Sequence, residues 1–382
     1  MADETVEVKA AGIQFYPESG PADEDLYDQI LSMWQAERSF LVLSGPPGVG
    51  KTRAVEDFVI EMLRSHKAQH DKETCRLSVL FPDYQTKTYS SDDIWKKLQE
   101  ARVYFVWDIC VLHPQYSYED LIRGVSIGSS TDDKPQLRVR EGILGLASRV
   151  AEVLEKLSPK STLPSTILIL DEINRAALGQ LFGEVIYALD RRGTPVATPH
   201  NLPGYGCHIK IPPGLLLFGT MNSVDRAISG FDFALKRRFS TLTLGASKEP
   251  VLHRYSSSTA FIINLVSKLY SYFEELVTSA TQVGVVPTTE LVIGHSYYLA
   301  PEKIAAEDEI VRWLAQSIQY QILPALIDYR EQGLLDYNQE NLESNPFKEY
   351  LLGEVPIANL KTNQLEEILK HFSPIQNEDN DG

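Results

Sequence analysis

The stretch Gly45-Pro-Pro-Gly-Val-Gly-Lys-Thr52 follows the apolar run Phe40-Leu-Val-Leu43 and precedes a segment with helical periodicity. The order of strand, glycine-rich loop and helix is typical of a phosphate-binding loop. Glycines let the backbone curl so that successive N–H groups point at phosphate oxygens, and the start of the next helix adds positive potential. The pattern predicts a nucleotide-binding α/β domain. The expected phosphate-binding residues are Gly45, Pro46, Pro47, Gly48, Val49, Gly50, Lys51 and Thr52.

Polar side chains at two strand ends predict the chemistry of this site. Lys51 is expected to reach the β- and γ-phosphates, and the Thr52 hydroxyl is expected to bind Mg²⁺. Downstream, the apolar run Thr166–Leu170 is typical of a buried parallel strand and ends in Asp171 and Glu172. We interpret it as a Walker B strand. Asp171 then holds the Mg²⁺ shell, and Glu172 orients or deprotonates the water that attacks the γ-phosphate.

A third strand candidate, Gly214–Thr220, leads into another group of polar residues. Asn222 fits a polar sensor of the γ-phosphate or of its water, and Asp225 adds a carboxylate. Further on, the segment Phe233-Ala-Leu-Lys-Arg-Arg-Phe239 places three adjacent cations between apolar residues. Such a cluster is commonly a solvated face. In ring-forming ATPases, however, an arginine at this place reaches into the neighbouring subunit's site.

Four motifs carry a resemblance to one family. They are GPPGVGKT (Gly45–Thr52), HPQYSYEDLIRG (His113–Gly124), LDEINRA followed by FGEVIYALDRRG (Leu170–Gly193), and GTMNSVDRAISGFDFALKRRFS (Gly219–Ser240). Over about residues 25–330 the chain resembles McrB, the AAA+ motor subunit of modification-dependent restriction systems. The second and third motifs are the more specific, because phosphate-binding loops occur in many families.

The resemblance implies an AAA+ P-loop NTPase fold, with a parallel sheet sandwiched by helices and followed by a smaller α-helical lid domain. It implies GTP, with Mg²⁺, bound between the subunits of a hexameric ring that translocates DNA. It also implies a McrC-like partner that carries the nuclease and stimulates hydrolysis. The family's MNxxDR signature falls on Met221, Asn222, Asp225 and Arg226, and its Asn and Asp help arrange the hydrolytic water beside Glu172. The arginine finger falls on Arg237 or Arg238, and the sequence does not choose between them.

Two segments depart from the family pattern. The usual MNTADRS reads MNSVDRA here, which leaves the preference for GTP over ATP open. The segment from Arg64 to Leu112 is longer than in the family, and we place an insertion at about residues 64–102. Its two interpretations are a docking surface and a solvated hairpin with a helix, the latter predicted at Asp92–Arg102.

The N-terminal part and the charge bear on DNA binding. Only 44 residues precede Gly45, so we expect no DNA-reading domain in this chain, and recognition of DNA to come from a partner or from the ring itself. The net charge is −16, but residues 1–30 hold eight acids and one base, and residues 376–382 hold three acids. The acidity is therefore concentrated at the ends, although nothing resembles a basic nucleic-acid stripe.

Other site classes find little support. Three isolated cysteines, Cys75, Cys110 and Cys207, form no CxxC pair, and no apolar run approaches a membrane span, so we expect a soluble, cytoplasmic protein without structural metal. His200 and His208 flank Cys207 in a stretch rich in Pro and Gly, which is weak support for zinc. Pro82-Asp83 with Asp132-Asp-Lys134 only loosely fits the PD-(D/E)xK nuclease pattern, so we expect cleavage to belong to another chain.

The periodicity predicts the order of domains. Strands near Phe40–Leu43, Val103–Leu112, Ile167–Leu170 and Leu215–Gly219 alternate with helices at Arg53–Leu63, Glu141–Leu157 and Gly179–Asp190, which implies a parallel sheet. We therefore expect an acidic leader over 1–22, the AAA+ αβ domain over 23–245 with a first helix at Asp23–Arg38, a helical lid over 246–345, and a C-terminal segment over 346–382 with a disordered tail. Lid helices are predicted from Ala260 and at Glu309–Tyr329, the second bent near Pro324.

Two other functions remain open at this stage. An ATP-driven remodelling chaperone of the MoxR or dynein-related kind shares the core site but acts on protein. A regulatory scaffold would use nucleotide only to assemble. Intact Lys51, Asp171, Glu172 and Asn222 argue against the scaffold, because a site that does not hydrolyse needs no water-activating carboxylate.

Overall fold

The computed structural model describes residues 24–66, 71–129, 135–157, 162–202, 205–224, 237–282, 286–337, 342 and 345–372. The predicted leader, residues 1–22, and the predicted tail after Pro374 lie outside the described residues. The chain divides into two compact units, one over Ala22–Ala246 and one that contains the helices after Ser247.

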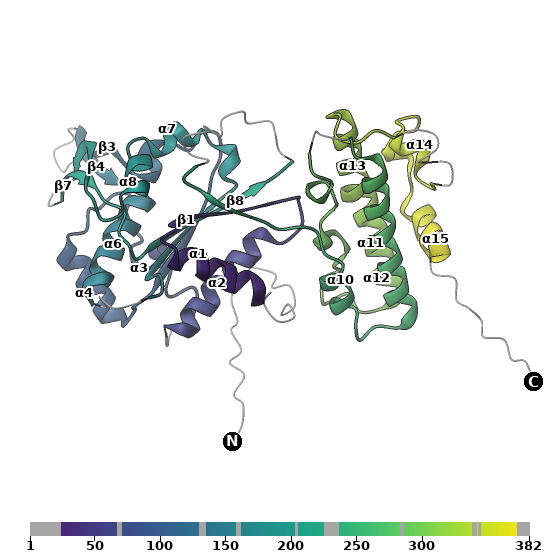
Figure 1. The fold of residues 1–382 in the computed structure, drawn as a ribbon, viewed down its shortest axis with the longest axis horizontal. Helices are drawn as coiled ribbons and strands as arrows, with labels where there is room; N and C mark the ends of the chain where they lie inside the picture. The colour runs from purple at the N-terminus through teal and green to yellow at the C-terminus, as the bar shows by residue number, and fades with distance from the viewer. Residues whose placement is uncertain are drawn as a thin grey trace, which may run out of the picture. The chain divides into compact units, whose positions relative to one another are not determined.

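A five-stranded parallel sheet forms the centre of the N-terminal unit (Figure 1). Its order is β2-β5-β8-β1-β9. The strands are β1 (Phe40–Gly45), β2 (Val106–Val111), β5 (Thr166–Asp171), β8 (Leu215–Asn222) and β9 (Ser240–Thr243). The predicted α/β class and the four predicted strands are therefore confirmed. β9 was not predicted, because Ser-Thr-Leu-Thr is short and carries little apolar signal.

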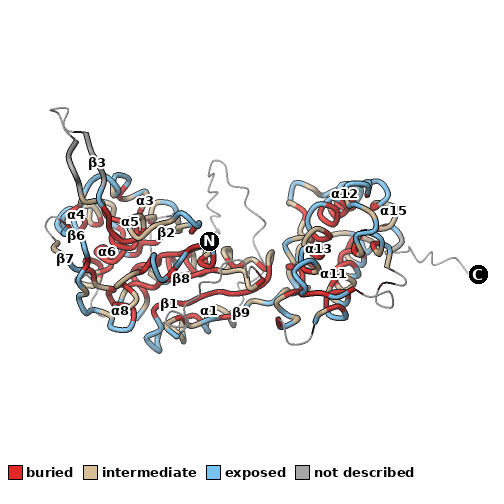
Figure 2. The backbone as a smooth tube through the Cα atoms, turned by 90° about the horizontal axis from the view of Figure 1, so that it is seen from above, coloured by how far each residue is buried: buried red, intermediate tan, exposed pale blue. Residues whose placement is uncertain are grey.

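The core of this unit lies along the sheet. β1 and β5 are continuous apolar runs because parallel strands are covered on both faces, and residues 40–43 and 167–170 are at most 1% exposed. Figure 2 shows β1 and β8 as buried strands at the centre of the unit. The helices of the unit are α1 (Glu24–Gln35), α2 (Lys51–Ser65), α3 (Leu77–Leu80), α4 (Ser91–Ala101), α5 (Tyr118–Leu121), α6 (Ile143–Leu157), α7 (Leu178–Phe182) and α8 (Val185–Asp190).

The helix predicted at Gly179–Asp190 is two helices. α7 ends at Phe182 and α8 begins at Val185, with Gly183 between them at φ +48°. A Cβ at Gly183 would lie 3.2 Å from the ring of Tyr118, so both the backbone angle and the close approach of that ring favour glycine. The continuous-helix prediction was wrong because helical periodicity does not register a single glycine that breaks the backbone.

The segment between α2 and β2 packs into the core rather than standing off it. Leu77, Phe81, Ile94 and Leu98 are fully buried in the main hydrophobic cluster. The Trp107 indole N–H of β2 donates to the Lys72 carbonyl at 2.6 Å. The predicted helix is present as α4, capped by Ser90 and Asp93, but a solvated hairpin is not what its described residues form. The structure therefore corrects the picture of a solvated element.

Two antiparallel hairpins extend the unit beyond the parallel sheet. One pairs β3 (Arg123–Ser129) with β4 (Pro135–Glu141), and the other pairs β6 (Val196–Leu202) with β7 (Gly206–Ile209). Arg123, 1% exposed, connects them: its guanidinium donates to the Thr198 hydroxyl and to the carbonyls of His200, Gly206 and His208 at 3.0–3.3 Å. A buried planar guanidinium can satisfy several acceptors at once, so Arg123 fixes the second hairpin to the first.

The C-terminal unit is helical (Figure 1). The predicted second lid helix is α12 (Glu307–Ser317), a π-helical segment η4 (Ile318–Ile322) and α13 (Leu323–Glu331), so its irregularity precedes Pro324. α15 packs on α11 and α12, and Arg312 pairs with Glu366 of α15 at 3.3 Å. The remaining elements are α10 (Glu249–Arg254), α11 (Ala260–Ala280), η2 (Thr288–Glu290), η3 (His295–Tyr298), α14 (Lys348–Leu351), η5 (Ile357–Asn359) and α15 (Thr362–Phe372).

Removing the Arg123 guanidinium is expected to destabilise the protein strongly. Arg123→Met keeps an apolar stem but leaves a hydroxyl and three carbonyls without their donor, so we expect a loss of about 3 kcal/mol in the free energy of unfolding. Urea unfolding followed by circular dichroism measures it. Arg64→Met is the matched control, since the Arg64 side chain is 74% exposed. A loss below about 1 kcal/mol for Arg123→Met would contradict this role.

Candidate nucleotide-binding site

Strand register brings the predicted site residues to one edge of the sheet. β8 lies between β5 and β1, with Gly45 opposite Asn222 and Leu170 opposite Gly219. Because all three strands are parallel, their carboxyl ends meet at the same edge, where open α/β sheets bind ligands. The first residue of the glycine-rich loop, the Asp171 carboxylate and the Asn222 amide therefore converge although they are far apart in the sequence.

Lys51 is held inside the glycine-rich loop. Its side chain is buried, and its ammonium group donates to the carbonyls of Gly45 and Pro46 at 3.0 and 2.9 Å and to the Asn222 Oδ1 at 2.7 Å. A buried ammonium requires acceptors, and here the loop and the third strand supply them. Gly48 and Gly50 both have φ +78°, a conformation that the loop needs to curl around this group. Lys51 is thus positioned at the phosphate site.

The residues expected to hold Mg²⁺ touch one another. The Thr52 hydroxyl donates to Asp171 Oδ1 at 2.9 Å, and the Thr220 hydroxyl donates to the same oxygen. Hydroxyl and carboxylate oxygens are the ligand types that Mg²⁺ prefers, usually together with phosphate oxygens and water. The donor set fits the ion, so Thr52 and Asp171 are the residues that would hold it.

Thr220 is a site residue that the sequence interpretation missed. It follows Gly219 on β8, next to the end of the Walker B strand, and its hydroxyl also accepts from the Glu172 backbone N–H at 3.2 Å. One side chain therefore orients both carboxylate residues. Threonine is common in strands, so residue type alone gave no signal. The alignment of the two strand ends could have found it.

Glu172 adopts an uncommon backbone conformation. Its φ and ψ are 58° and 46°, in the left-handed region, where non-glycine residues seldom lie and where strain gathers at functional sites. The 3₁₀ turn η1 (Ile173–Arg175) follows, and Arg175 Nε lies 3.4 Å from Glu172 Oε2. The candidate water-activating carboxylate is thus placed by a turn, not by the strand itself.

The two finger candidates differ in their surroundings. Arg238 Nε donates to Asp190 Oδ2 at 2.7 Å, a second guanidinium nitrogen lies 2.6 Å from the same oxygen, and the Arg238 side chain is only 9% exposed. Arg237 is exposed. Asp225, which the family signature placed beside the hydrolytic water, lies outside the described residues. The structure thus separates two arginines that the sequence left equivalent.

Two of the specific motifs contact each other. The Tyr118 hydroxyl, from HPQYSYEDLIRG, donates to Glu184 of the FGE segment, and the Tyr118 ring lies against Gly183. Burial, together with the bond to Glu184, raises the pKa of the Tyr118 hydroxyl, so that it remains a donor. The chain after the Walker B strand is thereby fixed to the segment that begins the first hairpin.

Other candidate sites are weaker. Among the described ranges no group of three or more His, Cys, Asp or Glu residues could hold a metal ion, and no helix there has the length and apolar content to cross a bilayer. Burial raises the pKa of the Cys75 and Cys110 thiols to about 11, so neither is a ready nucleophile at neutral pH. Asp132 and Lys134 of the weak nuclease pattern lie outside the described residues.

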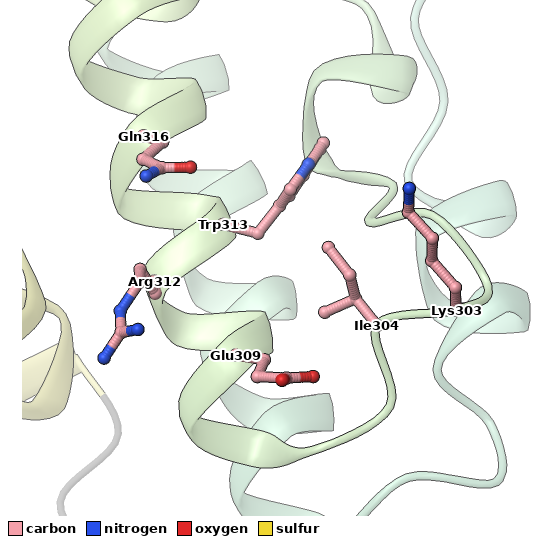
Figure 3. A pocket seen from close by; sticks show the side chains of 6 residues that line it. All are labelled: Lys303, Ile304, Glu309, Arg312, Trp313 and Gln316. Carbon is pink, nitrogen blue, oxygen red and sulfur yellow. The ribbon is translucent and has the colours of Figure 1, made fainter.

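A cleft of about 370 Å³ lies in the C-terminal unit (Figure 3). Trp313 and Ile304 face each other across it, whereas Arg312 points away toward the far side of α12. Its lining contains one carboxylate, Glu309, and no histidine or cysteine. We therefore assign it no catalytic role.

Comparison with known proteins identifies the family. Residues 91–239 match the model of the AAA domain (dynein-related subfamily). The chain is 26% identical over 298 residues to the type IV methyl-directed restriction enzyme EcoKMcrB subunit of Escherichia coli K12, a match that covers 76% of this chain and 53% of the relative. The chain is a McrB-like AAA+ NTPase.

Further similarities of this McrB-like chain are more limited. It is 32% identical over 93 residues to the type II restriction enzyme BsuMI component YdiS of Bacillus subtilis 168, covering 21% of this chain and 27% of that protein. The chain thus spans about half or less of the length of these relatives. A structure of NtrX from Brucella abortus in complex with ADP matches 94% of the chain and 64% of its own at 12% identity, but the TM-score of 0.36 is too low to support any argument.

Loss of the Thr220 hydroxyl is expected to weaken Mg²⁺-dependent nucleotide binding. Thr220→Val keeps the side-chain shape but removes the donor to Asp171 and the acceptor of the Glu172 N–H, so both carboxylates lose their orientation. We expect about a tenfold weaker Kd for nucleotide in the presence of Mg²⁺, consistent with one hydrogen bond to a charged group. Isothermal titration measures it. Thr220→Ser, which retains the hydroxyl, is expected to bind like the wild type, and equal weakening of both variants would refute the assignment.

Proposed function

We propose that the chain is the GTP-hydrolysing motor of a restriction or anti-phage defence system, assembled as a hexameric ring in the cytoplasm. The observation that supports it most is the contact of Lys51, Thr52, Asp171 and Asn222 at one sheet edge, in a chain similar to a methyl-directed restriction subunit. Such a constellation is what phosphoryl transfer requires, because that chemistry rests on positioning and on charge stabilisation.

The proposed roles follow from the contacts. On nucleotide binding, the Lys51 ammonium exchanges its loop carbonyls for β- and γ-phosphate oxygens, since it already lies among the backbone groups of the loop. Thr52 and Asp171 hold Mg²⁺, which supplies charge neutralisation at the phosphates. Glu172 orients and deprotonates the attacking water, and Asn222, freed from Lys51, contacts the γ-phosphate or that water. Asp225 assists Glu172 by the family resemblance.

Arg237 is the arginine finger in this proposal. Arg238 pairs with Asp190 of its own chain and is nearly buried, so a reach into a neighbouring site would first break that pair. Arg237 is exposed and has no such cost. An arginine in trans makes hydrolysis depend on assembly.

The nuclease belongs to another chain in this proposal. A McrC-like partner carries it, stimulates GTP hydrolysis and, with the ring, engages DNA. The described residues offer no cluster that could hold a catalytic metal ion apart from the nucleotide site, which supports a division of labour between chains.

One competing function has an observation in its favour. The match to the dynein-related AAA domain equally suits an ATP-driven remodelling chaperone that acts on protein. The core site would be the same in both, so nucleotide preference and partner dependence are what separate them.

Turnover measurements test the proposal directly. Phosphate release by the purified chain is compared with GTP and with ATP, each alone and with a McrC-like neighbour encoded beside it. We expect GTP-selective turnover that the neighbour stimulates at least tenfold, about the gain of 1.4 kcal/mol in transition-state stabilisation. ATP-selective turnover that is indifferent to the neighbour would favour the chaperone. Binding of nucleotide without any turnover would favour a scaffold.

Mixed rings distinguish the two arginines. Arg237→Ala and Glu172→Gln are each expected to lower turnover by 100-fold or more, in line with the loss of a finger or of a water-activating group. Mixing the two variants creates sites with an intact Glu172 from one chain and an intact Arg237 from its neighbour, so activity is expected to recover in part. Arg238→Ala serves as the comparison. Recovery with Arg238→Ala and none with Arg237→Ala would reverse the assignment.

A further inference from the structure

The turn after the Walker B strand combines three features that a settled structural turn seldom combines. Glu172 lies in the left-handed backbone region. Asn174 is 6% exposed, and neither atom of its amide group has a hydrogen-bond partner among the described residues. Buried polar groups are almost always paired, and exceptions call for an explanation such as a conformational change. Strained backbone at a catalytic position points the same way.

Arg175 is placed on Glu172 by the geometry of the same turn. In a 3₁₀ turn the side chains at positions i and i+3 eclipse each other, and the Arg175 N–H donates to the Glu172 carbonyl at 2.9 Å. This arrangement brings Arg175 Nε within 3.4 Å of Glu172 Oε2. The Arg175 side chain is 52% exposed and that of Glu172 25%, so the pair is accessible and weak enough to exchange.

We propose that Arg175 is a positioning residue that holds the Glu172 carboxylate in a resting orientation, and that hydrolysis requires its release. The inference rests on the proposed role of Glu172 in activating water. A carboxylate paired with a guanidinium is both displaced and a poorer proton acceptor, so the pair lowers the fraction of sites ready for chemistry. Rearrangement of the turn would release Glu172 and give the Asn174 amide partners in one step.

The change of Arg175 to Gln tests this restraint. Arg175→Gln keeps a polar side chain of similar reach but removes the charge, so basal kcat is expected to rise two- to fivefold with KM unchanged, the range that an exposed ion pair can contribute. Arg175→Lys keeps the charge and is expected to give a smaller rise. Steady-state phosphate release at saturating protein assembly measures both variants with GTP and with ATP.

Two controls keep the outcomes distinct. Arg64→Gln breaks a comparable i,i+3 pair with Glu61 at the far end of α2 and is expected to leave kcat unchanged. In a Glu172→Gln background, Arg175→Gln is expected to have no effect, because its target is gone. An unchanged or lower kcat in Arg175→Gln, or an equal rise in Arg64→Gln, would overturn the inference. If Glu172→Gln itself hydrolyses nucleotide at the wild-type rate, the proposed role of Glu172 fails first and takes the restraint with it.

Discussion

The parallel register of β5, β8 and β1 is the constraint on which the site depends. Three strands that share a direction deliver their last residues to one edge, and hydrogen bonding between neighbours fixes their relative height to within one residue. A slip of one residue between β5 and β8 would turn Thr220 away from Asp171, because successive strand side chains alternate faces. The contacts of Lys51 with Asn222, and of Thr52 with Asp171, are therefore consequences of sheet pairing rather than of any single motif.

The apolar residues of these strands serve that register. Continuous burial on both faces leaves no polar face that would tolerate a shifted strand, so the hydrophobic effect secures the same geometry that the ladder hydrogen bonds define. The polar residues begin where the burial ends, at Asp171 and at Asn222. Stability and chemistry are thus divided along the length of each strand, so a substitution in the strand interior acts on the site only through packing.

The sequence could predict what depends on local pattern. The glycine-rich loop and the apolar strands are local signals, and the pairing of Lys51 with the Walker B side follows from the general rule that parallel strands end at one edge. The break at Gly183 and the role of Arg123 could not be predicted, because each depends on residues distant in the sequence: the Tyr118 ring in one case and the β6–β7 carbonyls in the other. Thr220 was missed because its importance comes from the strand beside it.

The same reasoning explains why the two adjacent arginines differ. From the sequence, Arg237 and Arg238 are equivalent cations, and only Asp190, at the end of α8, distinguishes them. Asp190 belongs to the motif that also contains Gly183 and Glu184, which Tyr118 holds in place. The contact that retains Arg238 within its own chain is therefore anchored to the segment that follows the Walker B strand. A change in the turn at Glu172 would be transmitted along α7 and α8 toward Asp190, so the catalytic carboxylate and the arginine pair are connected through one continuous stretch of backbone.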